Sequence, residues 1–123
     1  MQDTLDYLYG LERFGIKLGL EVVEEVLDKL DNPQDKLKAI HIAGTNGKGS
    51  TANFIYNVLK ADYKVGLYTS PHLVKFNERI KINDKEISDE ELVRLTKIIQ
   101  EKGTEATFFE FTTALAFQYF AEQ

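Results

Sequence analysis

The chain has 123 residues, enough for one small domain and too few for two. Hydrophobic residues make up 43% and charged residues 28%, a mixture typical of a folded globular domain and not of a disordered segment. The 15 basic and 20 acidic residues give a net charge of −5, which argues against a nonspecific nucleic-acid binder because no basic excess offsets the phosphates. A local basic pocket for one anionic ligand is compatible with this charge.

The absence of cysteine excludes disulfides, thiolate zinc sites and thiol nucleophiles, and the 2 histidines are too few for a histidine-rich metal centre. No apolar run approaches the ~18–20 residues that a membrane span needs. The first residues are charged and show no signal-peptide pattern. We therefore expect a cytoplasmic protein without a membrane partner.

Helical spacing of apolar residues predicts the first elements of the chain. A short helix is expected over 4–11 and a second over 20–30, separated by a loop with Gly15 and Gly19. Asn32-Pro33 ends the second helix, because the residue before a proline disfavours helical backbone.

The next segments predict a βαβ unit. Residues 37–43 are short and largely apolar and are expected to form a buried strand. A helix follows over 50–61, with Ile55, Val58 and Leu59 facing inward, and 64–69 is expected to be a second strand. The strands of such units pair in parallel.

The last third of the chain predicts a hairpin and two helices. Residues 79–82 and 85–87 flank the tight turn Asn83-Asp84. Ser88 and Glu91 form a capping box that opens a helix to about Lys102. A final helix over 109–121 is rich in Phe and Ala. Two parallel strands do not complete a sheet, so we expect an α/β fold that is the opening portion of a larger domain. Further elements of that domain should cover the apolar residues near the end of the chain: Phe108, Phe109, Phe111, Leu115, Phe117 and Phe120.

The segment 44–50, Gly-Thr-Asn-Gly-Lys-Gly-Ser, lies between the predicted strand and helix, where a phosphate-binding loop belongs. Glycines let successive N–H groups point at one anion, and the helix N-terminus adds partial positive charge. The strict P-loop pattern is not met, because Ile42 replaces its first glycine and Gly49 separates Lys48 from Ser50. The alternative is a glycine-rich turn without a ligand.

This loop variant, over 41–51, closely resembles the ATP loop of the folylpolyglutamate synthase/dihydrofolate synthase family, which is related to the Mur ligases. Other segments resemble further elements of that family, in chain order: 13–21, 68–73 with 76–80, and 107–111. The resemblance implies a P-loop domain with a mostly parallel sheet flanked by helices, like the central domain of Mur ligases, incomplete in this chain. Because family members are several times longer, residues 1–123 would be the N-terminal portion of the ATP-binding domain, without its remainder and the second domain.

The resemblance also implies ligands. ATP would be bound by Thr45, Asn46, Gly47 and Lys48, completed by Gly49 and Ser50, and Lys48 would act catalytically on the terminal phosphates. Ser70 would bind Mg²⁺, since a hydroxyl at the end of a strand can coordinate a hard cation. The alternative for these residues is ordinary turn chemistry.

Thr107, Phe108, Phe109 and Glu110 resemble the segment that contacts dihydropteroate. A compatible alternative is a helix N-terminus, with Thr107 as N-cap and Glu110 as its capping-box partner. His72 is expected to be a polar loop residue and His41 a structural one. Glu78 and Arg79 are expected to form an ordinary ion pair in a structured loop.

The implied activity is ATP-dependent ligation of L-glutamate to folate, or to dihydropteroate, through an acyl phosphate. The alternative is a noncatalytic nucleotide-binding fragment, or half of a split enzyme that needs a second chain. We expect the 123-residue chain alone to be inactive and to associate with itself or with the missing C-terminal part.

Overall fold

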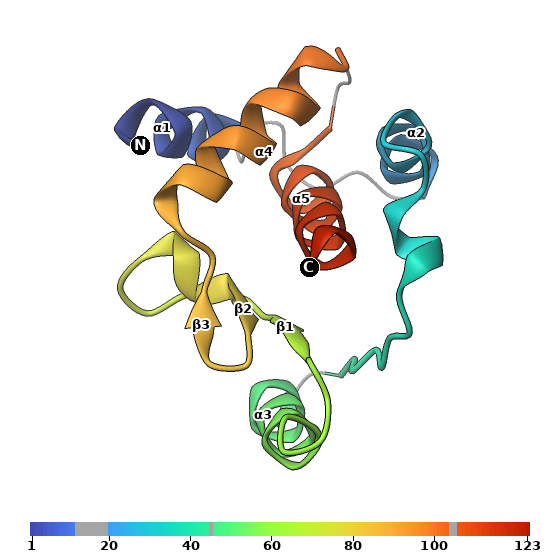
Figure 1. Ribbon diagram of the computed structural model, residues 1–123. Coiled ribbons are helices and arrows are strands. Elements are labelled where there is room, and N and C mark those ends of the chain that lie inside the picture. Colours follow the sequence, from blue (N-terminus) through green and yellow to red (C-terminus); the bar gives the residue numbers. More distant parts are fainter. Residues whose placement is uncertain (12–19, 45, 104–105) are drawn as a thin grey trace. The chain divides into compact units, whose positions relative to one another are not determined.

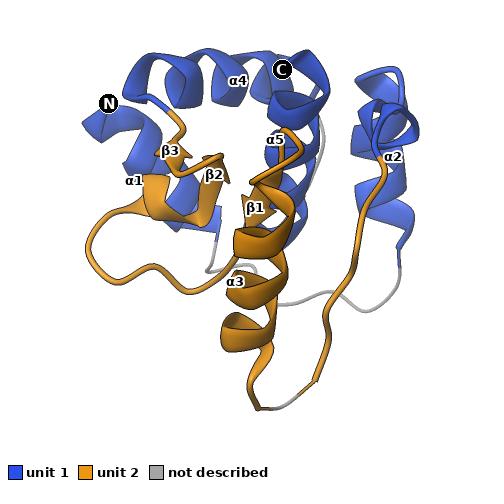
Figure 2. Cartoon of the chain, turned by 60° about the horizontal axis from the view of Figure 1, so that its bottom comes forward, with its two compact units in different colours: residues 1–37, 88–123 blue, residues 38–87 orange. Residues whose placement is uncertain are grey.

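The computed structural model describes residues 1–11, 20–44, 46–103 and 106–123 (Figure 1). The chain divides into two compact units, residues 1–37 with 88–123 and residues 38–87 (Figure 2). The expected loop with Gly15 and Gly19 lies outside the described residues.

The first unit is helical and is organised around α5 (Phe108–Glu122). This helix contacts α1 (Gln2–Gly10), α2 (Glu21–Lys29), the short 3-10 helix η2 (Pro33–Lys36) and α4 (Asp89–Glu101). Its buried residues include Phe111, Ala114 and Leu115, and the ring of Tyr7 meets Phe111 edge-on at 5.5 Å. Unlike these, Phe109 is 61% exposed, so the aromatic run is covered only in part.

The predicted helix boundaries of this unit are confirmed within a few residues. Asn32 adopts a left-handed conformation (φ 52°) beyond the end of α2, which asparagine tolerates better than most residues. At the start of α4 the Ser88 hydroxyl accepts a hydrogen bond from the backbone N–H of Glu91 at 3.2 Å. This bond satisfies one of the amides that a helix N-terminus leaves unpaired.

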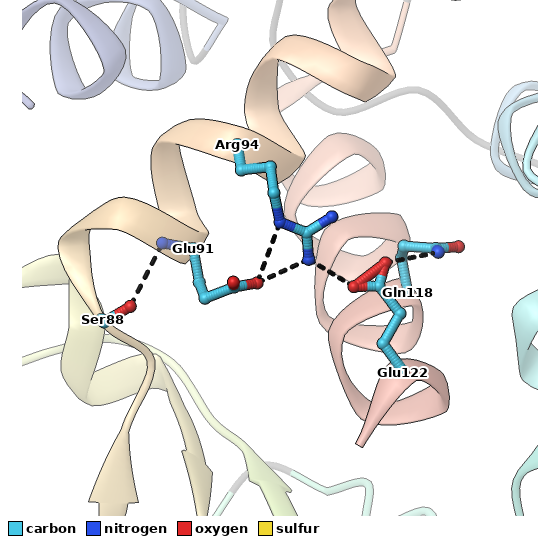
Figure 3. Close-up of polar contacts among 5 residues, drawn as sticks. All are labelled: Ser88, Glu91, Arg94, Gln118 and Glu122. Atoms are coloured by element: carbon cyan, nitrogen blue, oxygen red, sulfur yellow. Dashed lines mark hydrogen bonds and ion pairs between the residues drawn. The ribbon is translucent and has the colours of Figure 1, made fainter.

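Arg94 on α4 bonds to Glu91 of its own helix and to Glu122 of α5, and the bond to Glu122 joins the two helices (Figure 3). Its Nη2 donates to Glu91 Oε2 at 2.5 Å and also to Glu122 Oε1. Gln118 Nε2 donates to Glu122 Oε2 at 3.0 Å. Hydrogen bonds from Arg94 to Glu91 and Glu122 hold the pKa of Arg94 above its ordinary value.

The second unit contains α3 (Lys48–Leu59), β1 (Gly66–Tyr68), the 3-10 helix η3 (Phe76–Arg79), β2 (Ile80–Ile82) and β3 (Lys85–Glu86). The strands form a three-stranded sheet in the order β1-β2-β3, with both pairs antiparallel. Asn83 (φ 45°) and Asp84 (φ 72°) form a two-residue turn in which both central residues have positive φ. The predicted hairpin is thus confirmed.

The predicted strand over 37–43 is wrong for the described structure. These residues form no strand, and Ile40 is 63% exposed. The expected parallel pairing with 64–69 is likewise not observed among the described residues, where β1 is an edge strand that pairs antiparallel with β2. A strand exists only where a second backbone completes its hydrogen bonds, and an apolar composition does not supply that partner.

The inward face predicted for α3 is also partly wrong. Val58 is 59% exposed, whereas Tyr56, which was not expected inside, is the buried residue of this helix at 4% exposure. The Tyr56 hydroxyl can be buried because it donates a hydrogen bond to Asp84 in the hairpin turn. A buried tyrosine needs such a polar partner.

Candidate functional site

The glycine-rich segment forms a loop that leads directly into α3. Gly44 (φ 148°) and Gly47 (φ 72°) both have positive φ, and Gly47 is the N-cap of the helix. Such backbone is strained for residues with a Cβ, which explains glycine at these positions. Thr45 lies outside the described residues.

Exposed residues form the N-terminus of α3. The first-turn residues Lys48, Gly49 and Ser50 are exposed, the N-cap Gly47 has no side chain that could cap the helix, and the first turn contains no acidic residue. Asn46 before them is also exposed. Unpaired N–H groups and the positive end of the helix dipole favour a phosphate at such a place.

Lys48 is placed over this loop. Its Cγ lies 3.9 Å from the point that a Cβ on Gly44 would occupy, so the side-chain stem passes close to the Gly44 backbone. A cationic side chain and the N-terminal N–H groups of α3 therefore belong to the same turn.

Ser70 lies two residues after the end of β1 and is exposed, and its peptide bond to Pro71 is cis. The backbone N–H of Thr69 donates to the carbonyl oxygen of Arg79 at 3.0 Å. Residues 70–78 thus form a loop with its ends held together, which we call the 70–78 loop.

Charged side chains at the end of this loop bond back to its beginning. Arg79 Nε donates to His72 Nδ1 at 2.8 Å, and the Arg79 guanidinium lies 5.3 Å from the centroid of the Phe76 ring. Glu78 accepts hydrogen bonds from the backbone N–H groups of residues 73–75. The N–H groups of Lys75 and Leu73, more than the other contacts, hold the pKa of Glu78 below its ordinary value. The sequence did not reveal this role, because a carboxylate that binds backbone amides leaves no side-chain pattern.

In the helical unit, Thr107 is the N-cap of α5, as one interpretation predicted. Its Oγ1 donates to Glu110 Oε1 at 3.0 Å, so the two side chains bond to each other, and no side-chain hydrogen bond caps the helix. Both residues are buried, and Glu110 Oε2 has no hydrogen-bond partner among the described residues. Phe108 stacks on Tyr9 with ring centroids 6.1 Å apart, while Phe109 is exposed.

The predicted site residues therefore fall into separate groups. Asn46 to Ser50 and Ser70 belong to the second unit, and Thr107 to Glu110 to the helical unit. Among the described residues, no group of three or more His, Asp or Glu side chains is arranged to hold a metal ion. No helix in the described ranges is long and apolar enough to cross a membrane.

No protein-family model matches the chain. Individual relatives do: the dihydrofolate synthase/folylpolyglutamate synthase of Bacillus subtilis is 43% identical over 98% of this chain, and the folylpolyglutamate synthase of Lacticaseibacillus casei is 38% identical over 98%. The crystal structure of folylpolyglutamate synthase from Thermotoga maritima matches 98% of the chain with a TM-score of 0.87 and 44% identity. The chain belongs to the folylpolyglutamate synthase/dihydrofolate synthase family.

The match to this family covers only part of each relative. The chain spans about 30% of the Bacillus subtilis synthase and 30% of the Thermotoga maritima structure. Another matching structure is described as a folylpolyglutamate synthase complex with AMPPCP and folate, with a TM-score of 0.86 and 37% identity over 98% of this chain.

Proposed function

We propose that this chain is the N-terminal portion of the ATP-binding domain of a ligase that joins L-glutamate to folate. The observation that carries the proposal is the exposed N-terminus of α3, which begins at the N-cap Gly47 and has Lys48 in its first turn, in a chain of the synthase family. The matching complex with the ATP analogue AMPPCP and folate supports the same ligands here.

In the longer protein, further elements pack against the segment 37–43 and α3 and complete a mostly parallel sheet. Ile40 on this segment and Phe54 and Val58 on α3 are 63%, 71% and 59% exposed, which supports further elements packing against them. For the same reason the chain alone associates or needs the rest of the protein.

ATP is bound at the segment 45–50. The N–H groups of Gly47, Lys48, Gly49 and Ser50 face the phosphates, and Thr45 and Asn46 complete the loop. Lys48 neutralises charge on the transferring γ-phosphoryl group, so its contribution to catalysis is electrostatic.

Ser70 is the residue proposed to bind Mg²⁺. A hydroxyl is the hard oxygen ligand that Mg²⁺ prefers, and this ion is usually held by one or two protein groups together with substrate phosphates and water. A single exposed hydroxyl at the end of β1 fits such a site. When bound, the ion would offset negative charge on the phosphates.

The reaction proceeds in two steps. A carboxylate oxygen of folate attacks the γ-phosphorus of ATP, forming an acyl phosphate and breaking the bond to ADP. The amine nitrogen of L-glutamate then attacks the acyl carbon, releases phosphate and loses a proton as the amide forms. Lys48 and the loop amides hold the phosphoryl group in place for the first step.

Thr107, Phe108, Phe109 and Glu110 are proposed to contact folate, or dihydropteroate where the enzyme also adds the first glutamate. The exposed Phe109 ring supplies a flat apolar surface. Glu110 Oε2 supplies a buried acceptor for an N–H donor.

A phosphate-release assay on the full-length protein tests the proposal. Release should require ATP, Mg²⁺, folate and L-glutamate together, and mass spectrometry should show folate extended by one glutamate. Nucleotide binding without release under any of these conditions would instead favour the alternative, a noncatalytic nucleotide-binding protein.

A further inference from the structure

One carboxylate organises the 70–78 loop. Glu78 Oε1 accepts the backbone N–H of Leu73 at 2.8 Å, and Oε2 accepts those of Val74 at 3.0 Å and Lys75 at 2.8 Å. The side chains of Leu73 and Val74 are 94% and 86% exposed, so packing in a core does not shape this segment. Hydrogen bonds to Glu78 supply the restraint instead.

The start of the same loop is held by the next residue. The carbonyl oxygen of Arg79 accepts the N–H of Thr69 at 3.0 Å, and Arg79 Nε donates to His72 Nδ1 at 2.8 Å. Ser70 and Pro71 are the residues between these two anchored positions. Glu78 then fixes the chain immediately after His72, so the path of the backbone around Ser70 is set from residues 78 and 79.

We propose that Glu78 is a positioning residue whose carboxylate fixes the 70–78 loop and thereby the Ser70 hydroxyl. The proposal rests on the proposed function, in which Ser70 binds Mg²⁺. Both carboxylate oxygens of Glu78 are occupied by backbone amides, so we assign Glu78 no direct contact with the metal or the nucleotide. Its effect therefore shows in how strongly Mg²⁺ promotes nucleotide binding, and not in nucleotide binding without metal.

The hydrogen bonds of the Glu78 carboxylate indicate Glu78→Gln as the variant that tests the proposal. Both Glu78 oxygens accept from N–H donors, and glutamine has the same shape but offers only one oxygen. In Glu78→Gln an NH₂ group therefore faces at least one backbone N–H. Glu86→Gln is the matched control, because Glu86 pairs with Lys75 of the same loop, but through the Lys75 side chain, at 3.4 Å.

Two measurements on the full-length protein test this proposal. Hydrogen exchange of peptides that cover 72–76 should be at least about tenfold faster in Glu78→Gln and unchanged in Glu86→Gln. Titration with AMPPCP, with and without Mg²⁺, should show the Mg²⁺ requirement rising about tenfold in Glu78→Gln. The Kd of AMPPCP without Mg²⁺ should stay the same.

Equal exchange in wild type and Glu78→Gln would overturn the proposal, as would faster exchange with an unchanged Mg²⁺ requirement. Nucleotide binding that ignores Mg²⁺ in the wild type would also overturn it. Neither measurement depends on glutamate ligation. A protein that failed to ligate glutamate would therefore contradict the proposed function, while the exchange and Mg²⁺ titration results would still test the role of Glu78.

Discussion

The hydroxyl of Tyr56 bonds to Asp84 twice. It donates to Asp84 Oδ1 at 3.1 Å and accepts the backbone N–H of Asp84. Lys60, one turn further along the chain, adds an ion pair to Asp84 Oδ2 at 2.6 Å. These contacts tie α3, the helix that follows the glycine-rich segment 44–50, to the turn between β2 and β3.

Replacing Tyr56 with phenylalanine should destabilise the chain by about 1 kcal/mol, because the Asp84 N–H and carboxylate lose their partner while the ring stays in place. Urea denaturation of wild type and Tyr56→Phe measures the difference. Tyr63→Phe is the control, since Tyr63 is 65% exposed and its hydroxyl should contribute little. Equal losses in the two variants would show that the Tyr56 hydroxyl does not join these elements.

Lys48→Ala should lower the turnover of the full-length enzyme on the order of 10²–10³-fold, because one preorganised charged donor is removed from the phosphoryl group. Its melting temperature should match that of the wild type, as Lys48 is exposed. Lys85→Ala, which removes an exposed lysine on β3, is the control. Near-normal turnover in Lys48→Ala would remove this lysine from the ATP site.

Ser70→Ala should raise the Mg²⁺ concentration needed for half-maximal activity about tenfold, because the alanine methyl group cannot coordinate a cation. ATP binding measured without metal should not change. Activity is titrated against Mg²⁺ for both proteins. Superimposable curves would place the metal elsewhere.

Acid should weaken the helical unit through Glu122. Partial burial raises the pKa of this carboxyl, but hydrogen bonds from Arg94 and Gln118 outweigh burial and leave the pKa below the ordinary 4.5. A lowered pKa means that Glu122 stabilises the fold above about pH 4.5 and ceases to do so as the pH falls through the folded-state value.

Thermal melts between pH 7 and pH 3 test whether the stabilisation by Glu122 is lost as the pH falls. Wild type should exceed Glu122→Gln in stability at pH 7, and the difference should shrink at the acid end. Glu101→Gln, at the exposed end of α4, serves as the control. A difference that grows on acidification would mean that the Arg94 pair opposes folding.

Local signals in the sequence predicted local structure well. Ser88 and Glu91 marked the start of α4, Asn32-Pro33 marked the end of α2, and Asn83-Asp84 marked the hairpin. Each depends on contacts between residues near in sequence, so the residue types alone carry the information.

Features that depend on distant partners were predicted poorly. The strand expected over 37–43 needs a neighbouring backbone that an apolar run cannot specify. Burial of Tyr56 depends on Asp84, and the role of Glu78 depends on backbone amides, which look alike in every residue. The roles proposed for Lys48 and Ser70 follow from resemblance to the family, and the structure adds that Lys48 lies in the exposed first turn of α3.

We propose above all that this chain supplies the ATP site of a glutamate ligase. The most direct measurement follows ¹⁸O from a labelled folate carboxylate during turnover by the full-length protein with Mg-ATP and L-glutamate. Transfer of one ¹⁸O to the released phosphate is the predicted result, because the carboxylate oxygen that attacks the γ-phosphorus leaves with it. Glutamylated folate formed with unlabelled phosphate would contradict the acyl-phosphate route, and the absence of any glutamylated product would contradict the assignment as a ligase.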